Sequence, residues 1–201
     1  MNLNNAYYLK EKIAEILQNH YSKNLTVEIF FAGSQSILFN DLNINHNEII
    51  KSMELDCFSI TKDKELEDDI YNYLWVLGEL SEFHKENDFY LEPIGQNTVK
   101  LGKNWRNRVI DVDKVNNISF YSISIEDLIL SKYIASRPKD YDYNQSVIQG
   151  SLVNKKLLLK ILNEEYSDLS ISQKKIIKEK IKQHFNLPQI NVLNNKKTKL
   201  S

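Results

Sequence analysis

Two short segments of the sequence carry residue types and spacings that suit phosphoryl-transfer chemistry. The first, Phe30 to Ser34, is an apolar run that ends in Gly-Ser, and the second, Ser52 to Cys57, contains Glu54 and Asp56. Because alternate side chains of a strand leave on the same face, these two acids are expected to point together, about 6 to 7 Å apart. Carboxylates suit Mg²⁺, and pairs of such ions sit roughly 3.5 to 4 Å apart in phosphoryl-transfer enzymes. The pattern predicts a metal-dependent nucleotidyl-transfer site.

The Gly33-Ser34 pair is the candidate for binding phosphate. It follows an apolar strand and precedes a short helix, so Gly33 would let the backbone approach a triphosphate. Ser34 and the helix N-terminus would then offer donors to phosphate oxygens. Gly-Ser also occurs at many plain turns, so a turn without a ligand is the alternative.

The acidic pair has a similar alternative. Glu54 and Asp56 alternate with Met53, Leu55 and Cys57, which favours a strand with at least one covered face. Two carboxylates on such a face repel each other and lose hydration, which is unfavourable unless a cation binds between them. The competing interpretation is an edge strand whose acids lie in water.

Two-metal transfer usually requires a third carboxylate from a neighbouring strand. Asp111 and Asp113 share a strand face by the period of two. Asp111 is the preferred candidate because apolar residues flank it, whereas Asp113 precedes Lys114 and a turn.

The order of predicted elements indicates an α+β protein, with a mixed sheet, flanking helices and a C-terminal helical region. Apolar spacing predicts a helix over 5–21, and strands over 26–31 and 53–60. Ser34 is expected to cap a helix over 35–40, and Asp63 a helix that runs to Leu77. Residues 89–120 read as short strands in hairpin-like excursions, and helices follow Ser124. We expect three parts: residues 1–121, 122–186 and a flexible basic tail, 187–201.

Composition bounds the kind of protein. The 201-residue chain has a net charge of −1, but residues 171–201 carry eight lysines against Glu179 alone. This asymmetry predicts contact with an anionic partner such as RNA, or simply a solvated helix face and tail. A single cysteine, Cys57, excludes an internal disulfide, and no apolar run is long enough to span a bilayer. A cytoplasmic protein without membrane contact is expected.

The sequence resembles the nucleotidyltransferase superfamily, which has the DNA polymerase beta-like fold. More narrowly, it is similar to an uncharacterised bacterial branch related to nucleotidyltransferases of abortive-infection and toxin-antitoxin systems. The resemblance covers about residues 28–165. The matching stretches are Gly33 to Leu38, Ser52 to Asp56, Leu77 to His84, Gly102 to Arg108, Glu126 to Lys132, and Arg137 to Asp140.

The resemblance implies a nucleoside triphosphate substrate and Mg²⁺ or Mn²⁺ held by Glu54 and Asp56. It also implies that Lys132 and Lys139 reach the triphosphate; without it, they and Arg137 would be an ordinary helix face. The sequence departs from the superfamily at Glu54, the first residue of the acidic pair, where Asp is common. In addition, relatives often lack an acid at the Asp111 position. The acceptor is RNA, tRNA or a protein hydroxyl. The alternatives are a non-catalytic regulatory module with this fold, and a structural RNA-binding protein.

Overall fold

The computed structural model describes residues 1–21, 26–40, 52–150 and 153–187. Within these ranges the strands are β1 (Val27–Ala32), β2 (Glu54–Ile60), β3 (Tyr90–Pro93), β4 (Ile110–Val115) and β5 (Ile118–Ser122). The helices are α1 (Leu3–His20), α3 (Lys64–Leu74), α4 (Glu82–Asn87), α5 (Ile125–Ala135), α6 (Pro138–Gly150), α7 (Lys155–Glu164) and α8 (Ile171–Asn186). The short 3₁₀ helices are η1 (Ser34–Phe39), η2 (Trp75–Leu77), η3 (Gln96–Thr98) and η4 (Trp105–Arg108).

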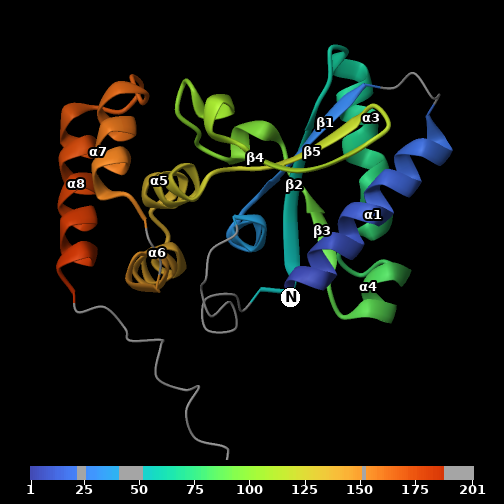
Figure 1. Cartoon of the computed structure of the whole chain (residues 1–201), viewed down its shortest axis with the longest axis horizontal. Helices are drawn as coiled ribbons and strands as arrows, with labels where there is room; N and C mark the ends of the chain where they lie inside the picture. Colours follow the sequence, from blue (N-terminus) through green and yellow to red (C-terminus); the bar gives the residue numbers. More distant parts are fainter. Residues whose placement is uncertain (22–25, 41–51, 151–152, 188–201) are drawn as a thin grey trace, which may run out of the picture.

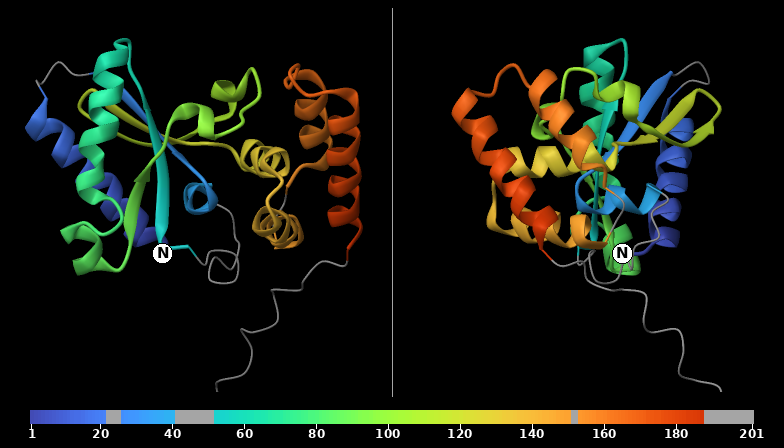
Figure 2. Two further views of the ribbon diagram at one scale, coloured as in Figure 1. Left: turned by 180° about the vertical axis from the view of Figure 1, so that it is seen from behind. Right: turned by 60° about the vertical axis from the view of Figure 1, so that its left-hand side comes forward.

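The strands form one mixed sheet in the order β3-β2-β1-β5-β4. β1 runs antiparallel to β2 and parallel to β5, β2 runs parallel to β3, and β4 and β5 are antiparallel. Figure 1 shows α1 and α3 together on one side of the molecule and the group α5 to α8 on the other, and Figure 2 shows the same separation from two further directions. The predicted α+β fold with flanking and C-terminal helices is confirmed.

The central position of β1 follows from its composition. Ile29, Phe30 and Phe31 are all buried, as expected for a strand covered on both faces. Helix α1 contributes an apolar stripe of residues spaced four apart, in which Leu9, Ile13 and Leu17 are buried in the core. Gly33, which directly follows β1, therefore lies near the end of β5, where Ser122 pairs with Phe31.

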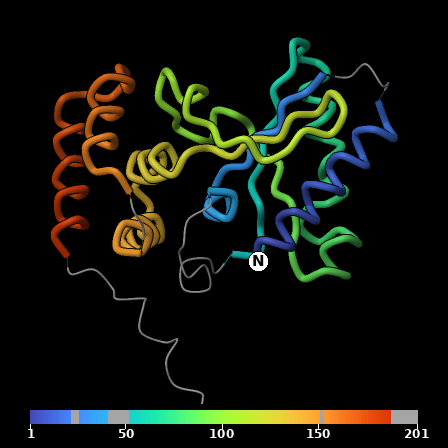
Figure 3. Tube along the Cα trace, viewed as in Figure 1, coloured from blue at the N-terminus to red at the C-terminus, as the bar shows by residue number. Residues whose placement is uncertain are grey.

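An ion pair between a buried lysine and an exposed carboxylate connects α1 to the β4 edge of the sheet. Lys10 of α1 lies in the core and donates to Asp113 of β4 and to Glu11. The Cα trace in Figure 3 shows the β4–β5 hairpin beside α1, where this contact is made. Asp113 therefore has a structural partner, and the pKa of its carboxyl is lowered chiefly by the Lys10 hydrogen bond.

The prediction of successive hairpins over 89–120 is correct only for its second half. β4 and β5 form a hairpin around Asn116, which has a positive φ of 55°. β3 instead lies parallel to β2, and α3 and α4 make the crossover between them. A parallel neighbour needs such a crossover, and local turn signals do not reveal which distant strand it joins.

The predicted helical part begins after β5, where Ser124 caps α5 by accepting from the Asp127 N–H. α5 and α6 pack together, α7 contacts α5, and α8 contacts both α6 and α7. The predicted tail over 187–201 lies outside the described residues except for Leu187. Among the described helices, none is both long enough and apolar enough to cross a membrane.

One arginine joins the sheet part to two of these helices. Arg108, at the end of η4, donates two hydrogen bonds to Asp127 of α5, at 2.8 and 2.9 Å. It also donates two to Glu165, directly after α7, at 2.6 and 2.9 Å. Asp127 is 1% exposed and also accepts from Ser124. Two bidentate contacts of this kind fix the orientation of α5 and α7.

Replacing Arg108 by methionine is expected to lower the free energy of unfolding by about 3 to 5 kcal/mol, because Asp127 would stay buried without its counter-ion. Urea unfolding followed by far-UV circular dichroism measures this. The control is Arg106→Met, two residues away, whose partner Glu28 is partly exposed. That variant is expected to lose about 1 kcal/mol or less. Equal losses in the two variants would contradict the role assigned to Arg108.

Candidate functional site

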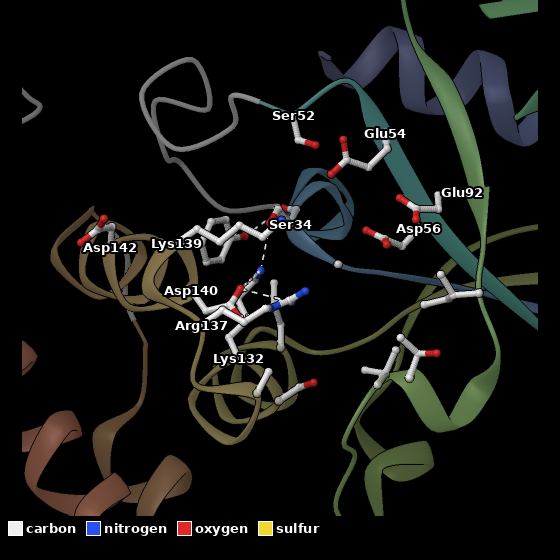
Figure 4. A pocket seen from close by; sticks show the side chains of 18 of the residues that line it. Ser34, Ser52, Glu54, Asp56, Glu92, Lys132, Arg137, Lys139, Asp140 and Asp142 are labelled. Carbon is white, nitrogen blue, oxygen red and sulfur yellow. Dashed lines mark hydrogen bonds and ion pairs between the residues drawn. The ribbon is translucent and has the colours of Figure 1, made fainter. Parts of the chain in front are cut away.

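A cavity of about 630 Å³ lies between the sheet and the pair α5–α6. Figure 4 shows its walls: Glu54, Asp56 and Glu92 project from the strands, and Lys132, Arg137 and Lys139 face them from the helical side. The volume falls within the roughly 300 to 1,000 Å³ of small-molecule sites. Of the site residues predicted from the sequence, all except Asp111 line this cavity.

Gly33 is required by the geometry where β1 ends. Its φ is 65° and its ψ is −169°, a region that only glycine adopts without strain. A Cβ built on Gly33 would lie 1.6 Å from Oδ2 of Asp56, which faces Ala32 in the antiparallel register. The Gly33 backbone therefore lies directly against the carboxylate, as the sequence spacing predicted for one shared pocket.

Ser34 has a different local role from the predicted one. It is the first residue of η1, whose N-cap is Gly33, and no side chain caps this short 3₁₀ helix. The Ser34 hydroxyl instead accepts from Nζ of Lys132 at 3.0 Å, and the Ser34 carbonyl accepts from the Tyr143 hydroxyl at 2.8 Å. The prediction of a serine cap is wrong, but Ser34 does lie in the cavity wall.

Three carboxylates occupy adjacent strands. Glu54 and Asp56 are two residues apart on β2, and Asp56 is paired in register with Glu92 of β3. Burial raises the pKa of Asp56 to about 7, helped by the charges of Glu92 and Glu54. Burial likewise raises the pKa of Glu92, with the Glu54 and Glu79 charges adding to the effect. Positively charged side chains therefore neutralise the negative charge of these three carboxylates only in part.

The donor set fits a hard cation in its chemistry. Oxygen ligands from Glu54, Asp56 and Glu92 are those that Mg²⁺ and Mn²⁺ prefer. As the side chains stand, the described residues contain no group of three or more His, Cys, Asp or Glu placed to hold a metal ion. The fit therefore rests on ligand type and on the raised pKa values of Asp56 and Glu92, which come chiefly from burial and in part from their acidic neighbours. Binding would require the carboxylates to converge.

Lys132 of α5 is held at the opposite wall. Besides Ser34, its Nζ contacts Oδ1 of Asp140 at 3.1 Å and lies 4.4 Å from the centroid of the Tyr143 ring. Burial lowers the pKa of Lys132, against the opposing effect of Asp140. An ammonium group with few solvent contacts is well suited to interact with an anionic ligand.

Asp140 keeps this cationic wall in order. It is 1% exposed and accepts from both Lys132 and Arg137, the latter at 2.7 Å. Burial alone would raise the pKa of Asp140, but the Arg137 and Lys132 contacts outweigh it and lower that pKa. Lys139 is exposed, lines the same cavity, and its charge opposes the rise in the pKa of Glu92.

The structure does not bring Asp111 to this site. Asp111 is an exposed residue of β4, and β5 and β1 both lie between β4 and β2. The expectation that its strand neighbours the acidic pair is wrong, because β4 lies at the opposite edge of the sheet from β3. Glu92 occupies the position that was assigned to Asp111.

Comparison with protein families matches residues 8–198 to the family described as "Nucleotidyltransferase of unknown function (DUF6036)". The chain belongs to this nucleotidyltransferase family. Neither the curated proteins nor the solved structures give a match. The family match spans both the sheet and the helices α5 to α8, so it includes both walls of the cavity.

For a nucleotidyltransferase, the most informative residue missed in the sequence is Glu92. Its signal was weak: Tyr90-Leu91-Glu92-Pro93 is a four-residue strand that ends in proline, within a segment rich in turn residues. Tyr143 was also missed, because a tyrosine on a helix gives no sign that it supports a lysine 11 residues earlier. Asp140, the last residue of the matching stretch Arg137 to Asp140, contacts Lys132.

Proposed function

We propose that this nucleotidyltransferase-family protein moves a nucleoside monophosphate from a nucleoside triphosphate to an acceptor hydroxyl, with Mg²⁺ or Mn²⁺. One observation carries the proposal: three carboxylates on β2 and β3 face a lysine-bearing helix across one cavity, beside the Gly33-Ser34 turn. Nucleotidyl transfer needs both sets of groups, because carboxylates hold the metal ion against the phosphates and cationic side chains offset the charge that develops on the leaving group.

In the proposed site, Glu54 and Asp56 hold the metal ion and Glu92 completes the acidic set. When bound, the metal ion neutralises charge on the phosphate oxygens and favours the ionised form of the attacking hydroxyl. Ser34 and the backbone beyond Gly33 contact the phosphates. Lys132 and Lys139 offset the charge that develops on the leaving pyrophosphate, and Asp140 orients Lys132.

The transfer step follows from this arrangement. The acceptor oxygen forms a bond to the α-phosphorus while the bond from that phosphorus to the bridging oxygen breaks, and pyrophosphate leaves. The hydroxyl proton passes to a carboxylate oxygen of Glu92. Burial raises the pKa of Glu92, which makes its carboxylate a stronger base.

The acceptor in the proposed reaction is RNA, with tRNA included, or a protein side chain. Exposed lysines of α7 and α8 support RNA, since phosphate contacts need a basic surface; they are Lys156, Lys160, Lys175 and Lys182. A role in toxin-antitoxin or abortive-infection systems would direct this transfer against the cell's own RNA or protein.

The test is label transfer. The full chain is incubated with Mg²⁺, each of the four α-labelled nucleoside triphosphates, and a total cell extract that contains RNA and protein. Label is expected to appear in macromolecules, to need the divalent ion, and to be removed by either ribonuclease or protease, which identifies the acceptor class. No transfer with any nucleotide, ion or extract would overturn the proposed activity.

A second candidate function is a binding module with this fold that does not catalyse transfer. It is favoured by the arrangement of the described acidic side chains, which do not yet form a three-ligand metal site. Such a module would bind a nucleoside triphosphate in calorimetry and yield no label transfer in the same extracts.

A further inference from the structure

One wall of the cavity is not used by the groups that handle phosphate and metal. It is apolar and comes from two segments: Leu128 and Ala135 of α5, and Ile94 and Val99 from the segment after β3. Residues 128, 131, 132 and 135 recur at helical spacing, so this wall and Lys132 share one face of α5. A ligand bound at Lys132 therefore reaches the apolar wall directly.

A single buried hydroxyl lies within this wall. Ser131 lines the cavity and is only 9% exposed. A serine inside a helix usually donates to the carbonyl four residues earlier, but Ser131 makes no such bond to Asp127 in the described structure. Its oxygen accepts from the backbone N–H of Lys100 at 3.1 Å, which fixes its position. The hydroxyl hydrogen has no acceptor among the residues that the structure describes.

The chemistry of this wall matches a flat heteroaromatic group. Aliphatic side chains on two sides would cover the faces or edges of a ring, and apolar burial of this kind gives affinity without selectivity. The free hydrogen and remaining lone pair of Ser131 could pair with ring nitrogens, carbonyls or amino groups at the ring edge. A polar group left unpaired in an apolar site disfavours ligands that cannot satisfy it.

We propose that the wall formed by Leu128, Ala135, Ile94 and Val99 binds the base of the nucleoside triphosphate, and that Ser131 hydrogen-bonds to the edge of that base. The proposal rests on the nucleotidyl-transfer function proposed above and assigns the part of the substrate that the phosphate-binding residues do not contact. The neighbouring positions of Ser131 and Lys132 on α5 set the direction of the ligand: phosphates at the lysine, base at the serine.

The test uses binding, so it does not depend on turnover or on knowing the acceptor. Calorimetry with Mg²⁺ gives the Kd of each of the four nucleoside triphosphates and of inorganic tripolyphosphate, which has no base. For Ser131→Ala, the Kd of the best nucleotide is expected to rise about 3- to 10-fold, since one hydrogen bond is lost. The preference among bases is expected to shrink, and the Kd of tripolyphosphate to stay unchanged.

A second variant tests the wall itself. Ala135 is exposed and near the end of α5, so Ala135→Trp is compatible with folding and would fill the apolar space. Nucleotide binding is expected to weaken at least about 10-fold while tripolyphosphate binding is retained. The control is Glu164→Trp at the exposed end of α7, which does not line the cavity and is expected to bind as the wild type does.

The outcomes separate the two proposals. If the wild type binds nucleotides but neither Ser131→Ala nor Ala135→Trp changes their affinities, the apolar wall does not bind the base. The wall would then be free to contact the acceptor. An equal loss for tripolyphosphate and nucleotides would also overturn the assignment, because the phosphate site would then be disturbed. If the wild type binds no nucleotide, the proposed function fails and this assignment fails with it.

Discussion

Asp56→Asn is expected to reduce nucleotidyl transfer by at least about 10³-fold. The reason is the loss of a charged metal ligand, a change that removes several kcal/mol of transition-state stabilisation, where about 4 kcal/mol corresponds to a factor of 10³. The measurement is the initial rate of label transfer at saturating Mg²⁺. Asn is nearly the same size, so Gly33 can keep its close approach to this side chain.

The same substitution is expected to stabilise the metal-free protein at pH 8. The pKa of Asp56 is about 7 in the folded chain, against an ordinary value of 3.8. The folded state therefore binds the proton more tightly than the unfolded state, and the free energy of unfolding falls as pH rises from about 4 through 7. Asparagine does not titrate in this pH range, so the free energy of unfolding of the variant lacks this dependence on pH. We expect it to gain about 2 kcal/mol over the wild type at pH 8, a value reduced for solvent in the open cavity.

Two results would contradict this account of Asp56. One is a parallel pH dependence of stability in the wild type and Asp56→Asn, measured by urea unfolding between pH 4 and 8 without divalent ions. The other is an unchanged rate of transfer in the variant. Added Mg²⁺ is expected to stabilise the wild type at pH 8 more than the variant, because a bound ligand stabilises the state that binds it.

Glu92→Gln is expected to lower the rate of transfer by roughly 10² to 10⁴-fold, as the loss of a general base does. The pH profile distinguishes this role from a structural one. With a raised pKa, Glu92 becomes protonated as pH falls, so the wild-type rate is expected to drop on the acidic side. The residual rate of the variant is expected to fall less steeply on that side, because Asp56 still becomes protonated there and Glu92 no longer does.

The matched control is Asp111→Asn, which removes the acid that the sequence had favoured. Asp111 is exposed on β4, at the other edge of the sheet from Glu92. Its replacement is expected to leave the rate of transfer within about twofold of the wild type and stability within about 0.5 kcal/mol. A large loss of activity in this variant, with Glu92→Gln active, would reverse the assignment of the third carboxylate.

The parts of the site that the sequence predicts are those fixed by short-range spacing. Glu54 and Asp56 share a strand face because their separation equals the period of a strand. Gly33 follows an apolar strand, and its positive φ is the reason that a glycine stands there. Lys132 and Lys139 came from the resemblance, and the structure places both of them at the cavity with the acids.

The parts that could not be predicted depend on which strands become neighbours. The period of two identifies the strand of Asp111, but it says nothing about the position of that strand in the sheet. Glu92 reaches Asp56 only because α3 and α4 return the chain to the open edge of β2. Likewise, Arg108 and Asp127 lie in two separate segments of the resemblance, and only the folded chain joins them.

The double grip of Arg108 has a consequence for how substrates enter. Asp127 precedes Leu128, Ser131 and Lys132 on α5, so the arginine that holds Asp127 also sets the distance from those three residues to the strands. The contacts of Arg108 thus hold the helical wall of the cavity in a fixed position relative to the sheet. We expect the cavity to bind its ligands without closure of the helices over them. Its preformed shape then determines which ligands bind.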